Sequence, residues 1–202
     1  MNIFEESLMP FWGPQRLAKI QSIKVGIAGA GGLGSNCAVN LARLGFKKMV
    51  IVDYDRVEAA NLNRQYYFFD QIGKPKVEAL RENLLRINPG LELAAIQAKI
   101  DSANAREFFQ DCQVVVEAFD KAEYKRDLVE QWLGTGVLVV AASGLAGWEN
   151  IDMVASRWLR PDFCLIGDLV SEVSGKLPPL APRVSVAAAK EANAVLEWVI
   201  KE

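Results

Sequence analysis

The sequence contains no histidine and only three cysteines, which lie far apart. A histidine general base and a histidine-ligated metal are therefore both excluded. Three separate cysteines form neither a four-cysteine zinc site nor a disulfide framework. We therefore expect no zinc, and any metal should be a hard cation held by oxygen atoms. We assign a structural role to the thiols of Cys37 and Cys112 and favour one for Cys164, whose alternative role as a thiolate nucleophile would need a nearby cation or helix end.

Long apolar runs and blocks of one charge are also missing. No run approaches the roughly 20 apolar residues of a membrane helix, and no basic-then-apolar leader opens the chain. We therefore expect a cytoplasmic protein without a membrane partner. Lysine and arginine number 23 against 25 acidic residues, a formal net charge of -2. Without a basic block, we expect no nucleic-acid partner either.

The apolar content of 51% is enough for the core of one domain covering all 202 residues. Within this single domain, we expect residues 1–22 to form an N-terminal helical arm. Further along, apolar runs typical of buried strands alternate with amphipathic helical patterns. The strand patterns lie at 24–28, 49–52, 93–96, 114–120 and 137–142, and the helical ones at 33–44, 75–87, 103–109, 122–132 and 184–199.

This alternation predicts an α/β fold of the Rossmann-like, doubly wound type, with a mostly parallel sheet. Two further short strands are predicted at 151–156 and 164–166, with no helix between them. We therefore expect antiparallel strands toward the C-terminus. Ligands of such sheets bind beyond the carboxyl ends of the strands, where the chemistry-bearing residues should meet.

A glycine-rich turn follows the first predicted strand. Gly29, Gly31 and Gly34 have the G-x-G-x-x-G spacing, with Gly32 between them. In this pattern the first glycine permits a tight turn, the second lets phosphate approach the backbone, and the third lets the helix pack on the strand. Asp53 ends the second strand about 20 residues later, where a carboxylate accepts from ribose hydroxyls. The context predicts a nucleotide site.

Asp55, two residues further, either joins this site or faces water. The polar segment that follows contains Arg64, and Lys76 lies shortly beyond it. Fixed cations beside phosphate favour cleavage of a triphosphate over hydride transfer, because they stabilise the charge that develops. Asn61 and Gln65 add amide donors and acceptors.

The end of the fourth predicted strand carries Asp120. A carboxylate at this place suits Mg²⁺ bound against phosphate oxygens. It also suits a helix N-cap, a common use of aspartate. The two roles are compatible.

Two other functions fit the same fold. A nicotinamide oxidoreductase agrees with the glycine turn, but hydride transfer to a carbonyl usually needs a proton donor. Histidine is absent, and none of the four tyrosines is followed four residues later by a lysine. A non-catalytic nucleotide-binding or partner-binding subunit is the other alternative.

Several motifs occur in one order along the chain: 29–35, 52–55, 61–65, 73–78, 86–89 and 118–120. In these motifs the sequence resembles the ThiF/MoeB/HesA family, relatives of the ubiquitin-activating enzymes, from about Ile23 to its end. The nearest likeness is to the short ThiF-like form of thiamine biosynthesis, which shares 142–147 and 181–183. The family adenylates the C-terminal glycine of a ubiquitin-like sulfur-carrier protein with a Gly-Gly end, using MgATP.

By residue match, the resemblance implies ribose contact for Asp53, triphosphate contacts for Arg64 and Lys76, Mg²⁺ for Asp120, and support of the phosphate site by Asn61 and Gln65. It also implies a homodimer in which an N-terminal arginine reaches into the partner's site, and Arg16 is the candidate. The Cys-x-x-Cys zinc pairs of many members are absent, and adenylation is better supported than any later sulfur step. The nucleophile would be a carboxylate, already ionised at neutral pH, so that no general base is needed.

Overall fold

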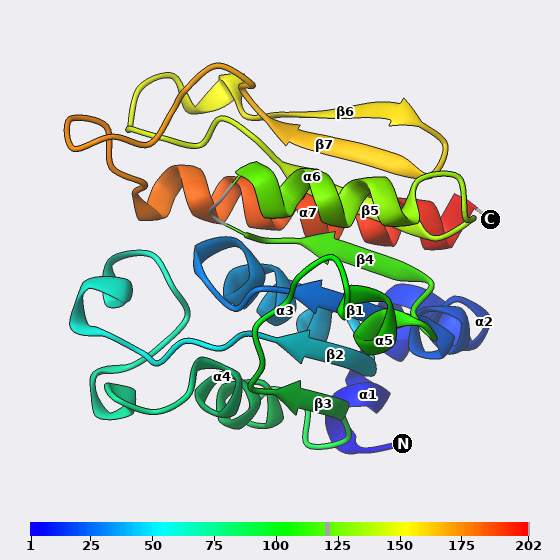
Figure 1. The fold of residues 1–202 in the computed structure, drawn as a ribbon. Helices are drawn as coiled ribbons and strands as arrows, with labels where there is room; N and C mark the ends of the chain where they lie inside the picture. Colours follow the sequence, from blue (N-terminus) through cyan, green and yellow to red (C-terminus); the bar gives the residue numbers. More distant parts are fainter. Residues whose placement is uncertain (120–121, 202) are drawn as a thin grey trace.

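The computed structural model describes residues 1–119 and 122–201. One sheet of seven strands runs through it in the order β3-β2-β1-β4-β5-β7-β6 (Figure 1). The strands are β1 (Lys24–Ala28), β2 (Lys48–Val52), β3 (Glu92–Ile96), β4 (Val114–Glu117), β5 (Leu138–Ala142), β6 (Ala155–Arg160) and β7 (Phe163–Gly167). The helices are α1 (Ile3–Ser7), α2 (Met9–Ser22), α3 (Gly32–Leu44), α4 (Lys76–Leu85), α5 (Ala105–Phe109), α6 (Ala122–Trp132) and α7 (Ala181–Lys201), with the 3-10 turns η1 (Ala59–Asn63), η2 (Phe69–Gln71) and η3 (Ile151–Met153).

The sheet confirms the predicted Rossmann-like, mostly parallel arrangement. All neighbouring strands from β3 to β7 pair in parallel, and the edge strand β6 pairs antiparallel with β7. The carboxyl ends of the parallel strands therefore share one edge, which faces left in Figure 1. The connections that follow β2 and β7 extend from this edge.

The strand predicted at 151–156 begins later in the structure than expected. Residues Ile151–Met153 form the 3-10 turn η3, and strand β6 begins only at Ala155. Asn150, with φ of 41°, turns the chain immediately before η3. The amides of Met153 and Val154 then bond back to the carbonyls of Asn150 and Ile151, so they cannot pair with a neighbouring strand.

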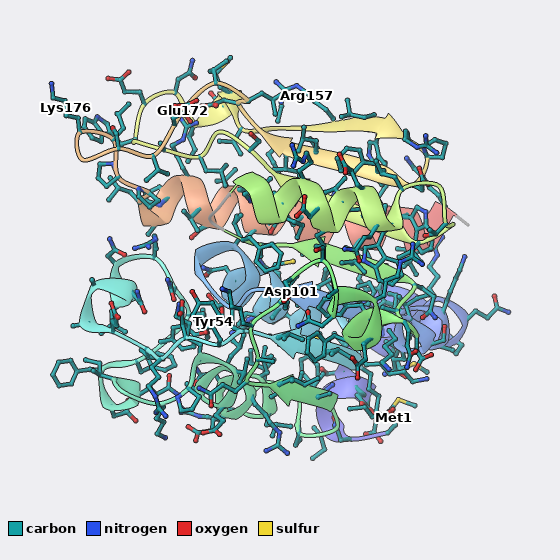
Figure 2. All side chains as sticks on the ribbon, viewed as in Figure 1. Met1, Tyr54, Asp101, Arg157, Glu172 and Lys176 are labelled. Atoms are coloured by element: carbon teal, nitrogen blue, oxygen red, sulfur yellow. The ribbon has the colours of Figure 1, made fainter. Side chains whose placement is uncertain are left out.

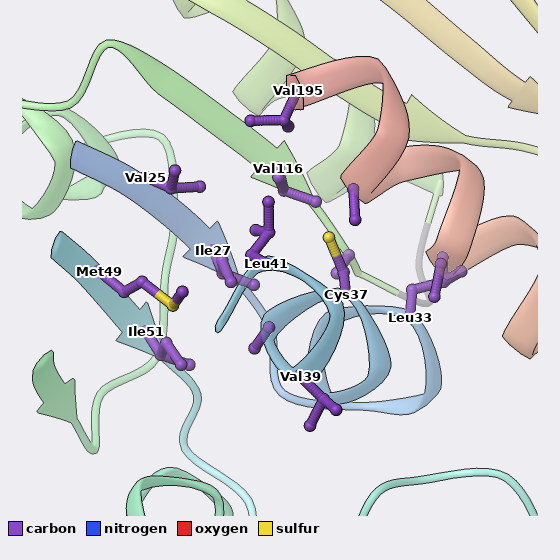
Figure 3. Packing of buried hydrophobic residues seen from close by; sticks show 14 of the residues in the cluster. Val25, Ile27, Leu33, Cys37, Val39, Leu41, Met49, Ile51, Val116 and Val195 are labelled. Carbon is purple, nitrogen blue, oxygen red and sulfur yellow. The ribbon is translucent and has the colours of Figure 1, made fainter. Parts of the chain in front are cut away.

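Helices cover both faces of the sheet. One core cluster combines residues of α3, α4 and α7 with one face, and a second combines α5 and α6 with the other. Figure 3 shows Cys37 and Leu41 of α3 near Ile27 of β1 and Val116 of β4, whereas Leu33 lies beside α7. Because the central strands are buried on both faces, their sequences are continuous apolar runs rather than alternating ones.

Helices α1 and α2 occupy most of residues 1–22, and they pack against the rest of the chain. Leu17 and Ile20 of α2 are buried, and the Trp12 indole donates to the carbonyl of Leu44 at 3.0 Å. Helix α2 lies beside the amino ends of the strands, on the right of Figure 1. Among the described helices, none combines the length and the apolar character needed to cross a membrane.

Candidate functional site

The glycine turn between β1 and α3 leaves no room for side chains at two positions. Gly29 has φ of 104°, in the left-handed region that favours glycine. A Cβ atom on Gly34 would lie 1.9 Å from the carbonyl oxygen of Gly29. A Cβ on Gly31 would meet only Nε2 of Gln65, at 3.9 Å. The turn is therefore closely packed beneath and open above Gly31, where a phosphate could approach the backbone.

Two hydroxyl groups fix the shape of this turn. The buried Tyr67 hydroxyl donates to the carbonyl of Ala30 at 2.6 Å. The Ser35 hydroxyl donates to the carbonyl of Gly31 at 2.6 Å and also accepts from the amide of Tyr66 at 3.0 Å. The turn and the segment around Tyr66 are thus held together before any ligand arrives.

The segment that contains Arg64 lies against the glycine turn. The Asn36 side-chain amide donates to the carbonyls of Gly32 and Arg64, at 2.7 and 2.9 Å. A Cβ on Gly32 would lie 3.5 Å from Cγ of Arg64. The structure therefore brings Arg64 to the glycine turn. Sequence reasoning missed Asn36 and Tyr67, and the only signal for Asn36 was its place two residues after the motif.

Gln65 presents a polar atom without a partner. Its side chain is buried, with 8% of the residue exposed, and within the described part of the chain its Oε1 forms no hydrogen bond. A buried polar atom left unpaired is costly. The atom of this side chain that lies beside the turn is the donor Nε2, 3.9 Å from the Cβ position of Gly31. Asn61 differs, because its Oδ1 accepts from the amide of Glu58 at 3.0 Å and caps η1.

Three charged residues form a chain of contacts that starts at the turn. Asp53 follows β2, and its two oxygens accept from the amides of Ala30 at 2.6 Å and of Asp55 at 2.7 Å. The Asp55 carboxylate in turn lies 2.8 Å from Nζ of Lys76, at the start of α4. The structure thus links Asp53, Asp55 and Lys76 to the glycine turn, and their roles in binding a nucleotide stay a prediction.

The loops that follow β5 and β7 meet at a buried ion pair. Arg183, in the first turn of α7, donates to the carboxylate of Asp168 and to the carbonyl of Glu149. Burial alone would raise the pKa of Asp168, but the amides of Ser171 and Val170 and the guanidinium of Arg183 lower it overall. The pair therefore keeps its charges and ties both loops to α7.

Helix α7 in turn touches the glycine turn. A Cβ on Gly32 would lie 2.9 Å from Cγ1 of Val184, the residue after Arg183. The two loops therefore border the same site edge as Arg64. Arg183 belongs to the sequence motif 181–183. Its partner Asp168 belongs to none of the motifs, so the sequence did not predict the ion pair.

Two predicted site residues stand apart. Asp120 lies outside the described residues, so its magnesium role stays a prediction. Arg16 is exposed on α2, at the opposite end of the sheet from the glycine turn, and the fold of one chain does not bring it to the site. Within residues 1–119 and 122–201, no group of three or more acidic or cysteine side chains is arranged to hold a metal ion.

The cysteines are all buried and free. Burial raises the pKa of the Cys112 and Cys164 thiols to about 11 and that of Cys37 well above its usual value. Thiols of this kind are poor nucleophiles at neutral pH. The structural assignment of the three cysteines is therefore supported.

Comparison with known proteins agrees with this geometry. The model of the ThiF family matches residues 4–163. The chain belongs to the ThiF family. The resemblance drawn from the sequence motifs is thereby confirmed, and the ordered motifs lie within the matched segment.

Proteins similar to this ThiF-family chain have different functions. The SAMP-activating enzyme E1 of Haloferax volcanii is 36% identical over 109 residues, which are 54% of this chain and 40% of that protein. The tRNA threonylcarbamoyladenosine dehydratase of Bacillus subtilis is 30% identical over 136 residues, 66% of this chain and 54% of that protein. The chain thus spans about half or less of these curated relatives.

The fold is also that of a solved relative. The E. coli tRNA N6-threonylcarbamoyladenosine dehydratase in complex with ATP matches with a TM-score of 0.86 and 18% identity, over 97% of this chain and 93% of that one. At this identity, the likeness shows the fold alone.

Proposed function

We propose that this protein is an adenylyltransferase that uses ATP to activate the C-terminal glycine of a ubiquitin-like sulfur carrier, with thiamine thiazole synthesis as the expected pathway. The observation that carries the proposal is the open glycine turn, bordered by the side chain of Arg64 and by the donor Nε2 of Gln65. An anion that approaches Gly31 would meet backbone amides at a helix N-terminus and the side-chain amide of Gln65, and we place the Arg64 guanidinium on it once it is bound.

Each predicted residue has a role in this site. Arg64 and Lys76 would bind the triphosphate, and the remaining lone pairs of Asp53 would accept from the ribose. Asp120 would hold Mg²⁺, which supplies charge neutralisation at the phosphates when it is bound. Asn61 contributes by fixing η1, the turn that precedes Arg64.

The reaction needs no general base. The carrier's carboxylate is ionised at neutral pH, and one of its oxygens attacks the α-phosphorus of ATP. The bond from the α-phosphorus to the bridging oxygen breaks, and pyrophosphate leaves with that electron pair. Positioning and fixed cations would supply the catalysis, which agrees with a chain that contains no histidine.

The surface beside the site favours a protein as acceptor. The two loops that follow β5 and β7 are tied together by bonds from Ala146 to Ser171 and from Gly147 to Pro178. Exposed large apolar side chains gather on these loops and on η3: Trp148, Met153, Leu169, Val170, Val173 and Leu177. Glu172 and Lys176 project from the second loop (Figure 2). A nucleic-acid surface would instead need clustered cations.

ATP–pyrophosphate exchange tests the proposal. We expect exchange to depend on a carrier with a Gly-Gly end and to fall by about 100-fold or more in Arg64→Ala, as for loss of a transition-state contact. Arg43→Ala removes an exposed arginine at the end of α3 and is the matched control. ATP binding without exchange on any carrier would identify a non-catalytic subunit instead. Exchange driven by a carboxylate-bearing tRNA would move the acceptor to nucleic acid.

The oligomeric part of the proposal is a homodimer in which Arg16 completes the partner's site. Because Arg16 lies on α2 at the far end of the sheet, it would reach only the nucleotide site of a second copy of the chain. Mixing Arg16→Ala and Arg64→Ala subunits should restore part of the exchange, because one hybrid site keeps both arginines. No recovery in the hybrid would remove Arg16 from the site.

A further inference from the structure

Lys76 is paired twice with Asp55. The backbone amide of Lys76 donates to the carbonyl of Asp55 at 2.9 Å, and Nζ lies 2.8 Å from Oδ2 of the same residue. The lysine side chain is 7% exposed, whereas that of Asp55 is 45% exposed. A buried ammonium group needs an anionic partner, since removing that partner leaves an uncompensated charge. Asp55 is that partner in this structure.

The backbone of Asp55 is anchored to the glycine turn, which keeps its carboxylate near that turn. Its own amide donates to Asp53, and the other oxygen of Asp53 accepts from the amide of Ala30 in the turn. Two hydrogen bonds therefore separate the anion that holds Lys76 from the place where a phosphate would approach. A phosphate that takes Lys76 competes with Asp55 at close range.

We propose that Asp55 is a positioning residue that acts as the internal counter-anion of Lys76. The carboxylate holds the ammonium group while the site is empty, a polyphosphate replaces it on binding, and Asp55 takes Lys76 back when pyrophosphate leaves. The inference rests on the proposed function, because that function assigns Lys76 to the triphosphate. Asp55 would then weaken polyphosphate binding and favour product release.

Calorimetric titration with inorganic tripolyphosphate, without divalent cations, tests this competition. The probe has neither ribose nor base, so only phosphate contacts are measured. Asp55→Asn should bind on the order of tenfold more tightly, because one charge-assisted contact no longer has to be broken. Asp55→Glu should return the affinity to that of the wild type. Asp55→Ser provides a second uncharged variant.

The chain offers a matched control two residues before Lys76. Lys74 pairs with Glu82 at 3.0 Å, with both side chains largely exposed. Glu82→Gln removes one negative charge from the same segment and should leave the affinity unchanged. In a Lys76→Met background, the gain from Asp55→Asn should vanish, because the competition requires the lysine.

Unchanged or weaker binding by Asp55→Asn would overturn the inference, as would an equal gain in Glu82→Gln. Failure of the proposed function has a different signature. It would appear as absence of carrier-dependent pyrophosphate exchange in the wild-type protein, whatever the titrations show.

Discussion

Gly31 and Gly34 lie three residues apart in one turn, yet a methyl group should have opposite effects at the two positions. At Gly34 the added Cβ would lie 1.9 Å from the carbonyl oxygen of Gly29, a distance that forces the backbone to move. At Gly31 it would meet only Nε2 of Gln65, at 3.9 Å, and φ of -76° suits any residue. Alanine at 31 therefore fits the empty protein but fills the space that a phosphate needs.

The magnitudes follow from these contacts. Gly31→Ala should raise the free energy of unfolding by about 0.4–1 kcal/mol, through the reduced entropy of the unfolded chain. Its intrusion on the bound phosphate should cost about 1–3 kcal/mol, which is roughly 5- to 150-fold in the Kd for ATP. Gly34→Ala should destabilise the fold by about 3 kcal/mol or more, and lower Tm by roughly 6–12 °C for a chain of this size.

Thermal unfolding and calorimetric ATP titration on the same samples check both expectations. Gly175→Ala is the control, since no atom lies within 4 Å of its Cβ position and the residue is in an exposed loop. It should leave the Kd for ATP unchanged and, by the same entropy argument, raise the free energy of unfolding by about 0.4–1 kcal/mol. ATP affinity of the wild-type level in Gly31→Ala would refute close approach of phosphate to this turn. A Gly34→Ala protein as stable as the wild type would refute the packing argument.

Three further predictions concern residues outside the glycines. Tyr67→Phe leaves the buried carbonyl of Ala30 unpaired and should cost about 1–3 kcal/mol, seen as a Tm lower by roughly 2–12 °C. Burial and then the charge of Glu117 raise the pKa of Glu191, so the contribution of Glu191 to stability should fall as pH rises above about 4.3, its unfolded pKa. Glu191→Gln should abolish that decline, and parallel stability curves for the two proteins would contradict it. An aromatic disulfide reagent at pH 7 should label the native protein slowly and the unfolded protein quickly, at Cys37, Cys112 and Cys164.

Much of the fold could be predicted because burial on both faces forces continuous apolar strands between amphipathic helices. The run from Val114 and the run ending at Ala142 both became central strands for this reason. The same reasoning wrongly predicted a strand at 151–153. Asn150 has a left-handed backbone conformation, and the residues after it form a 3-10 turn instead. A single backbone dihedral angle leaves no trace in hydrophobic periodicity.

The candidate site divides in a similar way. The glycines, Asp53 and Arg64 could be predicted because they belong to short motifs with fixed spacing. Tyr67 could not, because its hydroxyl bonds a carbonyl 37 residues away, and only the folded chain brings the two together. The unpaired oxygen of Gln65 is likewise a property of packing, since the sequence predicts an amide but not whether it finds a partner.

The charges at the site explain how two carboxylates can stand beside a place for polyphosphate. Both oxygens of Asp53 accept from backbone amides, and Asp55 is paired with Lys76, so neither acid presents a bare charge to the turn. Arg64 donates to neutral oxygens of Asn63 and Ala60, and it forms no ion pair within residues 1–119 and 122–201. Its full charge is therefore available to an anion at Gly31. For this reason Arg64→Ala should weaken ATP binding more than Lys76→Met, because the lysine must first give up Asp55.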